Sequence, residues 1–276
     1  MHLTESVLKD VYGKRSAEAR KGDFGRALVV GGSGLYSGAT ALSALAALRS
    51  GCDIVFIISP CRAADIAASF SPALITYPLK GSHLNLHQLD DIIEFSARKN
   101  AVSMGNGAGR REETMQLFRE LFSKIKAPKV IDADAIYAIK GKAKGSVITP
   151  NAREFDALSG SVEHDIEKRA EQVRKEAKKR EAVIVLKGKI DIISDGKLVA
   201  YNRTGNAYMT KGGTGDTLAG IALSFLAQGK DAFKAGCGAA YVNGAAGDLA
   251  AWEKRQGMLP TDLIEKIPDV VKKAWP

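Results

Sequence analysis

Short apolar runs that alternate with longer segments of helical pattern constrain the fold of this chain more than any other feature. Residues 26–31 and 54–59 are nearly continuous apolar runs, and the segment 38–50 between them is rich in alanine and leucine. Apolar runs without polar alternation are typical of strands that are covered on both faces. Strands that alternate with helices predict a mostly parallel sheet between two helical layers. We therefore expect a three-layer α/β/α fold.

The rest of the chain continues this alternation. We expect further strands at 73–76, 101–104, 129–131, 146–148 and 183–186, and helices at 1–21, 38–50, 86–97, 111–122, 133–139, 163–180, 214–227, 232–252 and 262–275. The runs 190–194 and 198–202 flank Asp195-Gly196, a pair typical of a β-hairpin turn, which predicts a late antiparallel hairpin. No repeat or low-complexity linker interrupts the pattern, so residues 1–276 are expected to form a single domain.

Composition limits the class of protein. Hydrophobic residues make up 45% of the chain and charged residues 26%, which is ordinary for a soluble globular protein. Neither a run of about 18 apolar residues nor the apolar core of a signal peptide occurs, so we expect a cytoplasmic protein without a membrane partner. The three cysteines, Cys52, Cys61 and Cys237, form no CxxC pair and have no histidine at ligand spacing. This argues against a zinc site and a disulfide framework.

The formal net charge of +9 does not by itself indicate a nucleic-acid partner. Much of the excess lies in residues 168–180, where glutamates alternate with the basic side chains at helical spacing. This pattern is typical of a solvated helix with ion pairs between successive turns. Aromatic residues do not interleave with the basic ones, so we expect no nucleic-acid ligand. A positive field would suit phosphorylated small molecules equally well.

Glycines follow several of the expected strands, at the sheet edge where open α/β proteins bind their ligands. The first turn, Gly31 to Gly38, has neither the glycine spacing of a dinucleotide-binding motif nor the Gly-Lys-Ser/Thr of a Walker A loop. The second, Met104 to Gly109, has three glycines in five residues, which lets the backbone approach a ligand closely. Tight packing and ligand contact remain alternative interpretations of both turns.

Polar residues follow two other expected strands. Asp132 and Asp134 come after 129–131, and Thr149-Pro150-Asn151 comes after 146–148, with Glu154 three residues on from Asn151. The two aspartates fit either carboxylates near a metal ion or helix caps. Helix capping explains the second segment almost as well as a functional role does.

The most specific segment is Gly205 to Gly220. Gly212, Gly213 and Gly215 free the backbone so that successive N–H groups can point the same way, and the helix that follows adds its positive N-terminal end. Such an arrangement predicts an anion hole suited to a phosphoryl group. Asp216 lies in the first helical turn, where capping is the alternative. The three glycines before it favour a catalytic role for Asp216.

The run Gly212-Gly213-Thr214-Gly215-Asp216 resembles the Gly-x-Gly-Asp signature of the ribokinase-like superfamily. Within that superfamily the chain resembles the NAD(P)H-hydrate dehydratases over residues 20–265. The segments that carry this resemblance are Lys21 to Gly25, Gly31 to Ala39, Asp132 to Ala135, Thr149-Pro150, Lys187-Gly188, Gly205 to Gly220, Tyr241 to Asp248 and Leu259 to Leu263. These enzymes use ADP or ATP to turn the hydroxyl of hydrated NADH or NADPH into a phosphate leaving group.

The resemblance implies a ribokinase-like fold and a set of catalytic residues. Asp216 is expected to be the base that activates the substrate hydroxyl, and Gly213 and Gly215 to form the anion hole. The implied reaction is dehydration of the S form of NADHX or NADPHX, with Mg²⁺ as cofactor and ADP or ATP as phosphate donor. We favour ADP.

It also implies the residues that bind the two substrates. Ala39, Gly107 and Asn151, with Asp216, match positions that contact the hydrate. The segment that lies along the nucleotide corresponds to Lys187, Gly188, Lys189, Ile190 and Asp191, with Gly215 bordering it. No metal ligand is implied with certainty, although Glu154 could meet Mg²⁺ through water. Related enzymes lead us to expect a homotetramer and a separate NAD(P)H-hydrate epimerase as functional partner.

Three positions depart from the family pattern. Asn151 stands where histidine is usual, Asp191 stands where threonine is usual, and Ile136-Tyr137 replaces Leu-Asn. An acid at 191 beside a nucleotide phosphate would repel it unless a cation or a hydrogen-bonded hydroxyl intervenes. These changes bear on nucleotide preference and substrate identity more than on the fold.

Two other functions remain open from the sequence. A small-molecule kinase of the same fold, acting on a vitamin precursor such as hydroxyethylthiazole, would use the same aspartate and anion hole but leave the phosphate on its product. A non-catalytic nucleotide- or nucleic-acid-binding protein would bind without turnover, which would leave the glycines and Asp216 unexplained.

Overall fold

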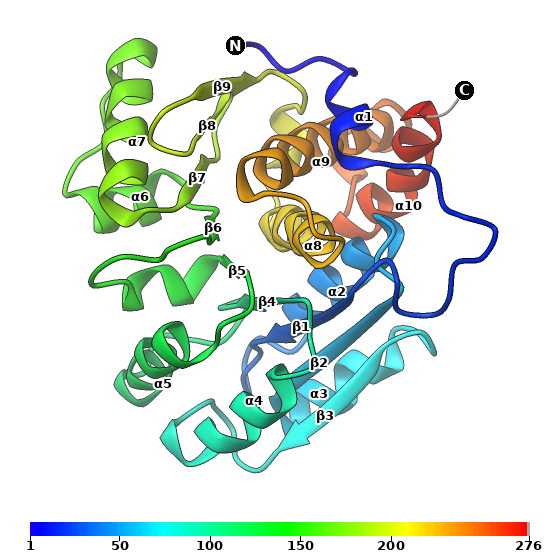
Figure 1. The fold of residues 1–276 in the computed structure, drawn as a ribbon, viewed down its shortest axis with the longest axis vertical. Coiled ribbons are helices and arrows are strands. Elements are labelled where there is room, and N and C mark those ends of the chain that lie inside the picture. Colours follow the sequence, from blue (N-terminus) through cyan, green and yellow to red (C-terminus); the bar gives the residue numbers. More distant parts are fainter. Residues whose placement is uncertain (275–276) are drawn as a thin grey trace.

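The computed structural model describes residues 1–274, through which one nine-stranded sheet runs (Figure 1). The strands lie in the order β3-β2-β1-β4-β5-β6-β7-β8-β9. They are β1 Arg26–Val30, β2 Ile54–Pro60, β3 Ile75–Leu79, β4 Ala101–Met104, β5 Lys129–Ile131, β6 Val147–Ile148, β7 Val183–Leu186, β8 Asp191–Ser194 and β9 Val199–Asn202. All pairs from β3 to β7 are parallel, whereas β8 is antiparallel to both β7 and β9. The predicted α/β fold with a late hairpin is therefore confirmed.

Helices cover both faces of the sheet (Figure 1). The α-helices are α1 Val7–Val11, α2 Ala39–Arg49, α3 Cys61–Ser69, α4 Leu89–Ser96, α5 Glu112–Lys124, α6 Ala152–Ser159, α7 Ile166–Arg180, α8 Thr214–Ala227, α9 Ala232–Lys254 and α10 Pro260–Val271. Short 3₁₀ segments are η1 Leu86–Gln88, η2 Ala133–Ala138, η3 Ala207–Met209, η4 Arg255–Gly257 and η5 Lys272–Ala274. Among residues 1–274, none of these helices is long and apolar enough to cross a membrane.

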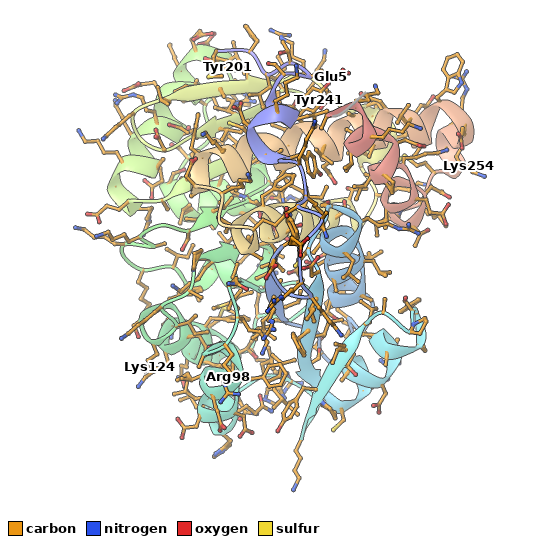
Figure 2. The ribbon with its side chains drawn as sticks, turned by 45° about the vertical axis from the view of Figure 1, so that its right-hand side comes forward. Glu5, Arg98, Lys124, Tyr201, Tyr241 and Lys254 are labelled. Carbon is orange, nitrogen blue, oxygen red and sulfur yellow. The ribbon has the colours of Figure 1, made fainter. Side chains whose placement is uncertain are left out.

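Alternate residues of the parallel strands enter two separate apolar cores. Val29 of β1 belongs to the core that also contains residues of α1, α2, α8, α9 and α10, whereas its neighbour Leu28 belongs to the core with residues of α4, α5, α6 and α7. Both side chains are fully buried, which explains why the strands are apolar without alternation. Charged side chains such as Arg98, Lys124 and Lys254 point outward from the ribbon (Figure 2).

Several sequence predictions about individual elements were wrong. The expected helix 1–21 is helical only in α1, and 133–139 forms the 3₁₀ segment η2, in which Ala133 has a φ of +50°. The third strand begins at Ile75 instead of residue 73, and α3 was not predicted. The expected helix 262–275 begins at Pro260, and its last residue lies outside the described residues.

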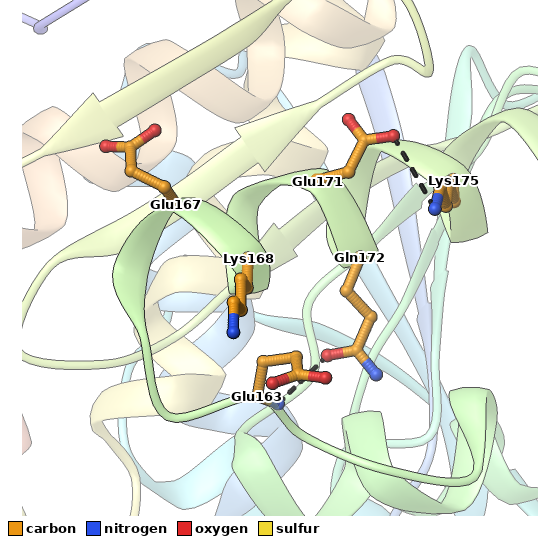
Figure 3. Close-up of a pocket in the computed structure, with 6 residues that line it drawn as sticks. All are labelled: Glu163, Glu167, Lys168, Glu171, Gln172 and Lys175. Atoms are coloured by element: carbon orange, nitrogen blue, oxygen red, sulfur yellow. Dashed lines mark hydrogen bonds and ion pairs between the residues drawn. The ribbon is translucent and has the colours of Figure 1, made fainter.

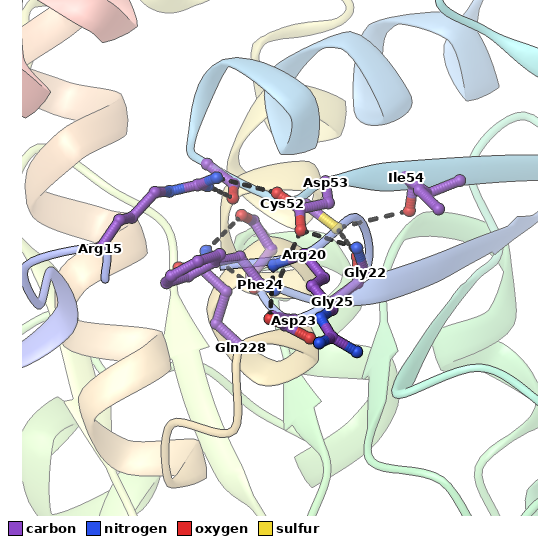
Figure 4. Close-up of polar contacts among 12 residues, drawn as sticks. Arg15, Arg20, Gly22, Asp23, Phe24, Gly25, Cys52, Asp53, Ile54 and Gln228 are labelled. Atoms are coloured by element: carbon purple, nitrogen blue, oxygen red, sulfur yellow. Dashed lines mark hydrogen bonds and ion pairs between the residues drawn. The ribbon is translucent and has the colours of Figure 1, made fainter. Parts of the chain in front are cut away.

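The segment between α1 and β1 forms turns, and polar contacts hold it against the start of β2 (Figure 4). Asp53 accepts hydrogen bonds from the backbone N–H groups of Gly22 and Phe24 at 2.9 and 3.1 Å. Arg15 pairs with Asp53 at 2.9 Å and lies over the Phe24 ring at 3.9 Å. Burial opposes ionisation of Asp53, but these hydrogen bonds and Arg15 hold its pKa below the usual range. Both oxygens of the Asp53 carboxylate are thus paired with donors of this N-terminal segment.

The hairpin loop is one residue longer than the interval 195–197 that the predicted strands leave between them. Ser194 pairs with Val199, so four residues connect β8 and β9. Asp195 accepts the N–H groups of Lys197 and Leu198 at 2.8 and 2.7 Å, and the Ser194 hydroxyl donates to the Leu198 carbonyl at 2.6 Å. These side-chain hydrogen bonds stabilise the wider loop.

Candidate active site

Asp216 lies in the first turn of α8, directly after the glycine-rich segment. Gly213 precedes the helix with a φ of +104°, and a Cβ there would approach Leu42 Cδ1 to 2.7 Å and Pro260 Cγ to 2.8 Å. Both the backbone conformation and the lack of space therefore require glycine at this position. The helix start is fixed against α2 and α10, and its N–H groups are available to an anion.

The Asp216 side chain is held by Asn106, which follows β4. The Asn106 amide nitrogen donates to Asp216 Oδ1 at 2.8 Å and to Asp132 Oδ2 at 3.1 Å. Its carbonyl oxygen accepts a hydrogen bond from the Ser103 hydroxyl at 3.1 Å. Asn106, Ser103 and Asp132 are fully or almost fully buried.

Asp132 connects this contact to the ammonium group of Lys187, a half-buried side chain. Its Oδ1 accepts hydrogen bonds from the Thr149 hydroxyl at 2.7 Å and from Lys187 Nζ at 3.0 Å. Lys187 Nζ is also 3.8 Å from Glu154 Oε2. Asp132, Thr149 and Lys187 each follow the end of a parallel strand, so the sheet places them at one edge.

Lys187 also lies beside the expected anion hole. A Cβ added at Gly215 would be 3.2 Å from Lys187 Nζ, which places the ammonium group against the first turn of α8. A lysine ammonium and free helix N–H groups facing the same space form a site for a phosphoryl group.

The environment shifts the pKa of Asp216, Glu154, Asp134 and Lys187. Burial raises the pKa of Asp216 to about 7, Asp132 adds to the rise, and the hydrogen bond from Asn106 opposes it. Burial also raises the pKa of Glu154 and of Asp134. Burial disfavours the charged form of Lys187, but Asp132 and Glu154 outweigh it and raise the pKa of this ammonium. Asp216 is therefore a carboxyl group that can take up a proton near neutral pH.

The structure brings Ala39 and Gly107 together, as expected of two residues in one site. A Cβ at Gly107 would be 3.0 Å from Ala39 Cβ and 2.9 Å from Tyr36 Cβ, and Gly107 has a φ of +64°. The backbone carbonyl oxygen of the preceding residue, Asn106, accepts a hydrogen bond from the Gly32 N–H at 2.8 Å. The first two glycine-rich turns therefore meet beside Asn106.

Asn151 and Glu154 cap α6 reciprocally. The Asn151 carbonyl oxygen accepts the Glu154 N–H at 3.0 Å, and Glu154 Oε2 accepts the Asn151 N–H at 2.8 Å. The capping interpretation of this segment is thus correct. The geometry leaves the amide nitrogen of Asn151, which is an exposed residue, directed away from the cap.

The carboxylate of Asp191 is engaged within its own segment. Its Oδ1 accepts the Gly188 N–H and its Oδ2 accepts the Asn202 amide, both at 3.0 Å. Burial raises the pKa of Asp191, and these hydrogen bonds oppose the rise. Lys189, together with Gly188, is exposed at the turn between β7 and β8, and Ile190 is half-buried. Both oxygens of this carboxylate, for which repulsion of a phosphate was expected unless a cation or a hydroxyl intervened, are thus held by donors of the protein.

Asp134 and Tyr137 both lie close to Arg110. Asp134 Oδ2 accepts the Gly109 N–H at 2.8 Å, and Arg110 Nε is 3.8 Å from Asp134 Oδ1. The Arg110 guanidinium lies over the Tyr137 ring at 4.7 Å. Neither Asp132 nor Asp134 caps η2 with its side chain, so the capping interpretation of these two aspartates was wrong.

Sequence analysis missed the side-chain roles of Asn106 and Thr149 and the ion pair between Asp132 and Lys187. A signal was available, because each of these residues comes at or just after the end of an apolar strand in the parallel sheet. Their mutual contacts depend on strand order, which the sequence does not state.

Other features lie apart from these residues. The hollow in Figure 3 is lined by Glu163 and by five side chains of α7, and contains none of the predicted site residues. Within residues 1–274, no three His, Cys, Asp or Glu side chains are grouped so that they could hold a metal ion.

Comparisons with known proteins agree with this geometry. A bifunctional NAD(P)H-hydrate repair enzyme of Pyrobaculum aerophilum is 45% identical over 264 residues, covering 94% of this chain and 53% of that protein. An ADP-dependent (S)-NAD(P)H-hydrate dehydratase of Cenarchaeum symbiosum is 37% identical over 277 residues, covering 98% of this chain and 96% of that one. The chain thus spans about half the length of the bifunctional relatives and nearly all of the shorter one.

A solved structure and a family model extend the agreement. The ADP/ATP-dependent NAD(P)H-hydrate dehydratase of Bacillus subtilis, co-crystallised with ATP and Mg²⁺, has a TM-score of 0.82 and 28% sequence identity. The match covers 98% of this chain and 97% of that one. The model of the NAD(P)H-hydrate dehydratase family matches residues 27–269. This chain belongs to the NAD(P)H-hydrate dehydratase family.

Proposed function

We propose that this chain catalyses the nucleotide-dependent dehydration of the S form of NADHX or NADPHX, which returns NADH or NADPH. The observation that carries the proposal is the position of Asp216. A half-buried carboxyl group with a pKa of about 7 lies in the first turn of a helix, one residue from Gly215 and close to Lys187. A base, helix N–H groups and a cation around one space are what phosphoryl transfer to a hydroxyl requires.

The chemistry follows from the groups around Asp216. Its carboxylate takes the proton of the hydrate hydroxyl, whose oxygen then attacks the terminal phosphorus of the nucleotide and displaces the shorter nucleotide. The N–H groups at Gly213 and Gly215 and the ammonium of Lys187 stabilise the negative charge of the phosphoryl group. The phosphate then leaves with the substrate oxygen while a neighbouring carbon loses a proton, which forms the double bond.

The remaining predicted residues divide between the two substrates. Ala39, Gly107 and Asn151 would contact the hydrate, since Gly107 lies next to Asn106 and Ala39 next to Gly107. Lys187, Gly188, Lys189, Ile190 and Asp191 would lie along the nucleotide, and the exposed turn Gly188-Lys189 leaves room for it. We favour ADP as donor, as in the name of the Cenarchaeum symbiosum relative.

Mg²⁺ fits this site only as a partner of the nucleotide. Within the described residues no ready-made cluster of carboxylates exists, and Mg²⁺ commonly keeps several waters and binds substrate phosphates. Glu154, half of whose carboxylate is occupied by its own helix cap, could meet the ion through water. When bound, the ion would neutralise phosphate charge.

Other features of the proposal come from the sequence alone, either from its pattern and composition or from the resemblance. They are a single domain over residues 1–276, a cytoplasmic location, a homotetramer and a functional partnership with an NAD(P)H-hydrate epimerase. Most of the small residues of α9, which could otherwise form subunit contacts, are buried inside the chain. A Cβ at Gly238 would lie 2.6 Å from Val11 Cγ1, and one at Gly236 would lie 3.0 Å from Val185 Cγ2. They therefore give the tetramer no support.

The test is to incubate the purified protein and Mg²⁺ with hydrated NADH and with ADP, ATP or neither, and to follow the NADH absorbance. Recovery that requires a nucleotide would support the proposal and identify the donor. Well-folded protein that restores no NADH with either nucleotide would contradict it. Products of incubation with hydroxyethylthiazole, analysed for a stable phosphate ester, would then test the kinase alternative.

A further inference from the structure

Asn106 is a buried side chain to which neither the sequence motif nor the proposed chemistry gives a role. It lies in the turn after β4, with no exposed surface, and its side chain makes three hydrogen bonds. Two of them reach carboxylates of different elements: Asp216 at the start of α8 and Asp132 after β5. Asn106 therefore connects the proposed base to the Asp132–Lys187 ion pair.

The orientation of the Asn106 amide follows from its neighbours. The nitrogen donates to the two carboxylates, and the oxygen accepts from the Ser103 hydroxyl. The opposite orientation would direct the amide oxygen at two carboxylates, none of which can donate when ionised. Since each amide hydrogen serves one carboxylate, a single side chain fixes both groups.

The two carboxylates depend on Asn106 to different degrees. Asp132 has two further partners, the Thr149 hydroxyl at 2.7 Å and Lys187 Nζ at 3.0 Å. For Asp216, the one side-chain hydrogen bond that the described residues show is the bond from Asn106. Removing the amide would thus leave Asp132 paired and leave Asp216 without a donor.

We propose that Asn106 is a positioning residue: its amide nitrogen holds the Asp216 carboxylate in one orientation and keeps it apart from Asp132. The proposal rests on the proposed function of Asp216 as the base. A freely rotating carboxylate would spend less time aligned with the substrate hydroxyl. An unscreened approach to Asp132 would also favour protonated Asp216, which cannot accept the hydroxyl proton.

The charges that face Asp216 determine the expected pH response. Asp132 and Asp134 raise its pKa, as does burial, whereas Lys187 and the Asn106 hydrogen bond lower it. Loss of the Asn106 donor removes one of the two contributions that lower the pKa of Asp216. The pKa of Asp216 should then rise above its value of about 7.

The experiment compares wild-type protein with Asn106→Ala in two measurements. Carboxyl ¹³C NMR, with Asp216→Asn to assign the signal, follows the titration of Asp216 directly. We expect the pKa to rise by about one unit in Asn106→Ala, the size expected for one hydrogen bond to a charged group. In the dehydration assay, the acid limb of kcat against pH should shift by the same amount, and the alkaline plateau should fall about tenfold.

Asn202→Ala is the matched control. Asn202 is equally buried, but it donates to Asp191 and the Ala240 carbonyl and not to Asp216. Its replacement should leave the Asp216 titration unchanged, even if thermal stability falls. If Asn106→Ala does not fold, Asn106→Asp keeps the shape and the acceptor for Ser103 while replacing the donor, and it should raise the Asp216 pKa as well.

The outcomes are distinct. A folded Asn106 variant with an unshifted Asp216 titration and an unchanged pH profile overturns the positioning role. If the wild-type protein restores no NADH, the proposed function fails, while the NMR titration still tests whether Asn106 holds Asp216.

Discussion

Two groups of charged side chains in this molecule each contain a hydrogen-bonded carboxyl group, but the pKa of that carboxyl group is raised in one and lowered in the other. At the active site, Asp132 is buried and Asp216 and Lys187 are half-buried, and burial raises the pKa of Asp216 to about 7. On α7, Glu171 pairs with Arg174 at 2.7 Å at the surface, and its pKa is lowered by that partner. Distance to a partner does not separate the two cases, because Asp216 is 2.8 Å from its donor. The two cases differ in burial and in the presence of nearby carboxylates, both of which raise the pKa of Asp216.

The comparison shows how one chain keeps a carboxyl group reactive. A charged donor such as Arg174 fixes the ionised form of Glu171, whereas the neutral amide of Asn106 orients Asp216 without neutralising it. The cation of the site, Lys187, is hydrogen-bonded to Asp132 instead. Asp216 can therefore exchange a proton near neutral pH, which a base must do.

Substitution of Asp216 should have the largest effect on activity. Asp216→Asn keeps the size of the side chain but removes the base, so turnover should fall by about 10² or more. Nucleotide binding, measured by calorimetry, should change little because the glycines and Lys187 are retained. Turnover close to that of the wild type would contradict the assignment of Asp216 as the base.

Replacing Lys187 should damage both the anion site and the fold. In Lys187→Met the buried carboxylate of Asp132 loses its cation, and breaking such a pair costs about 3 kcal/mol of unfolding free energy. We expect nucleotide affinity to fall at least tenfold as well, because the ammonium lies beside Gly215. Urea unfolding measures the first effect and nucleotide titration the second. Lys189→Met, at the exposed turn two residues on, is the matched control for stability.

The raised pKa of Asp216 predicts how stability changes with pH. The folded state holds this proton up to about pH 7, and the unfolded state releases it near 3.8. The folded state therefore binds more protons between these values, so this group's contribution to stability falls as pH rises through that window. Asp216→Asn lacks the effect and should be more stable than wild type at pH 8, by at most about 4 kcal/mol, with a smaller difference at pH 4.5.

Urea unfolding of both proteins at the two pH values measures this difference. A gap of equal size at pH 4.5 and pH 8 would mean that Asp216 does not titrate with a raised pKa. In the same pH range, kcat of the wild-type enzyme should rise through about pH 7, because the base must be ionised. Nucleotide binding followed over that range separates titration of Asp216 from titration of the phosphates.

The sequence predicted most of the sheet and the elements of the site, but not their contacts. The strands 101–104, 129–131 and 183–186 and helix α8 were placed correctly, because apolar runs and glycine punctuation are local signals. The first 21 residues were not, since their conformation depends on distant contacts such as the Arg15–Asp53 ion pair. The contact of Asn106 could not be predicted for the same reason. Its partner Asp216 is 110 residues away, and the strand order brings the two residues together.

Tyr137 and Asp191 concern a second property that the sequence does not predict, the direction of a side chain. Both were identified as departures from the family pattern, and the expected consequence at Asp191 was repulsion of phosphate. The structure directs this carboxylate to Gly188 and Asn202, so the departure is accommodated by a hydrogen bond between β8 and β9. Side-chain direction depends on a partner strand that residue identity alone does not reveal.

The smallest effect is expected on α7, which provides the other half of the comparison. Glu171→Gln removes the partner of Arg174 and Lys175, but all three side chains are at least partly in water. Exposed pairs of this kind contribute little to the free energy of unfolding, and turnover should not change because the helix contains none of the site residues. Thermal unfolding at low and high salt measures the effect, which salt should further reduce. A stability loss as large as that of Lys187→Met would mean that exposure does not distinguish the two groups of charges.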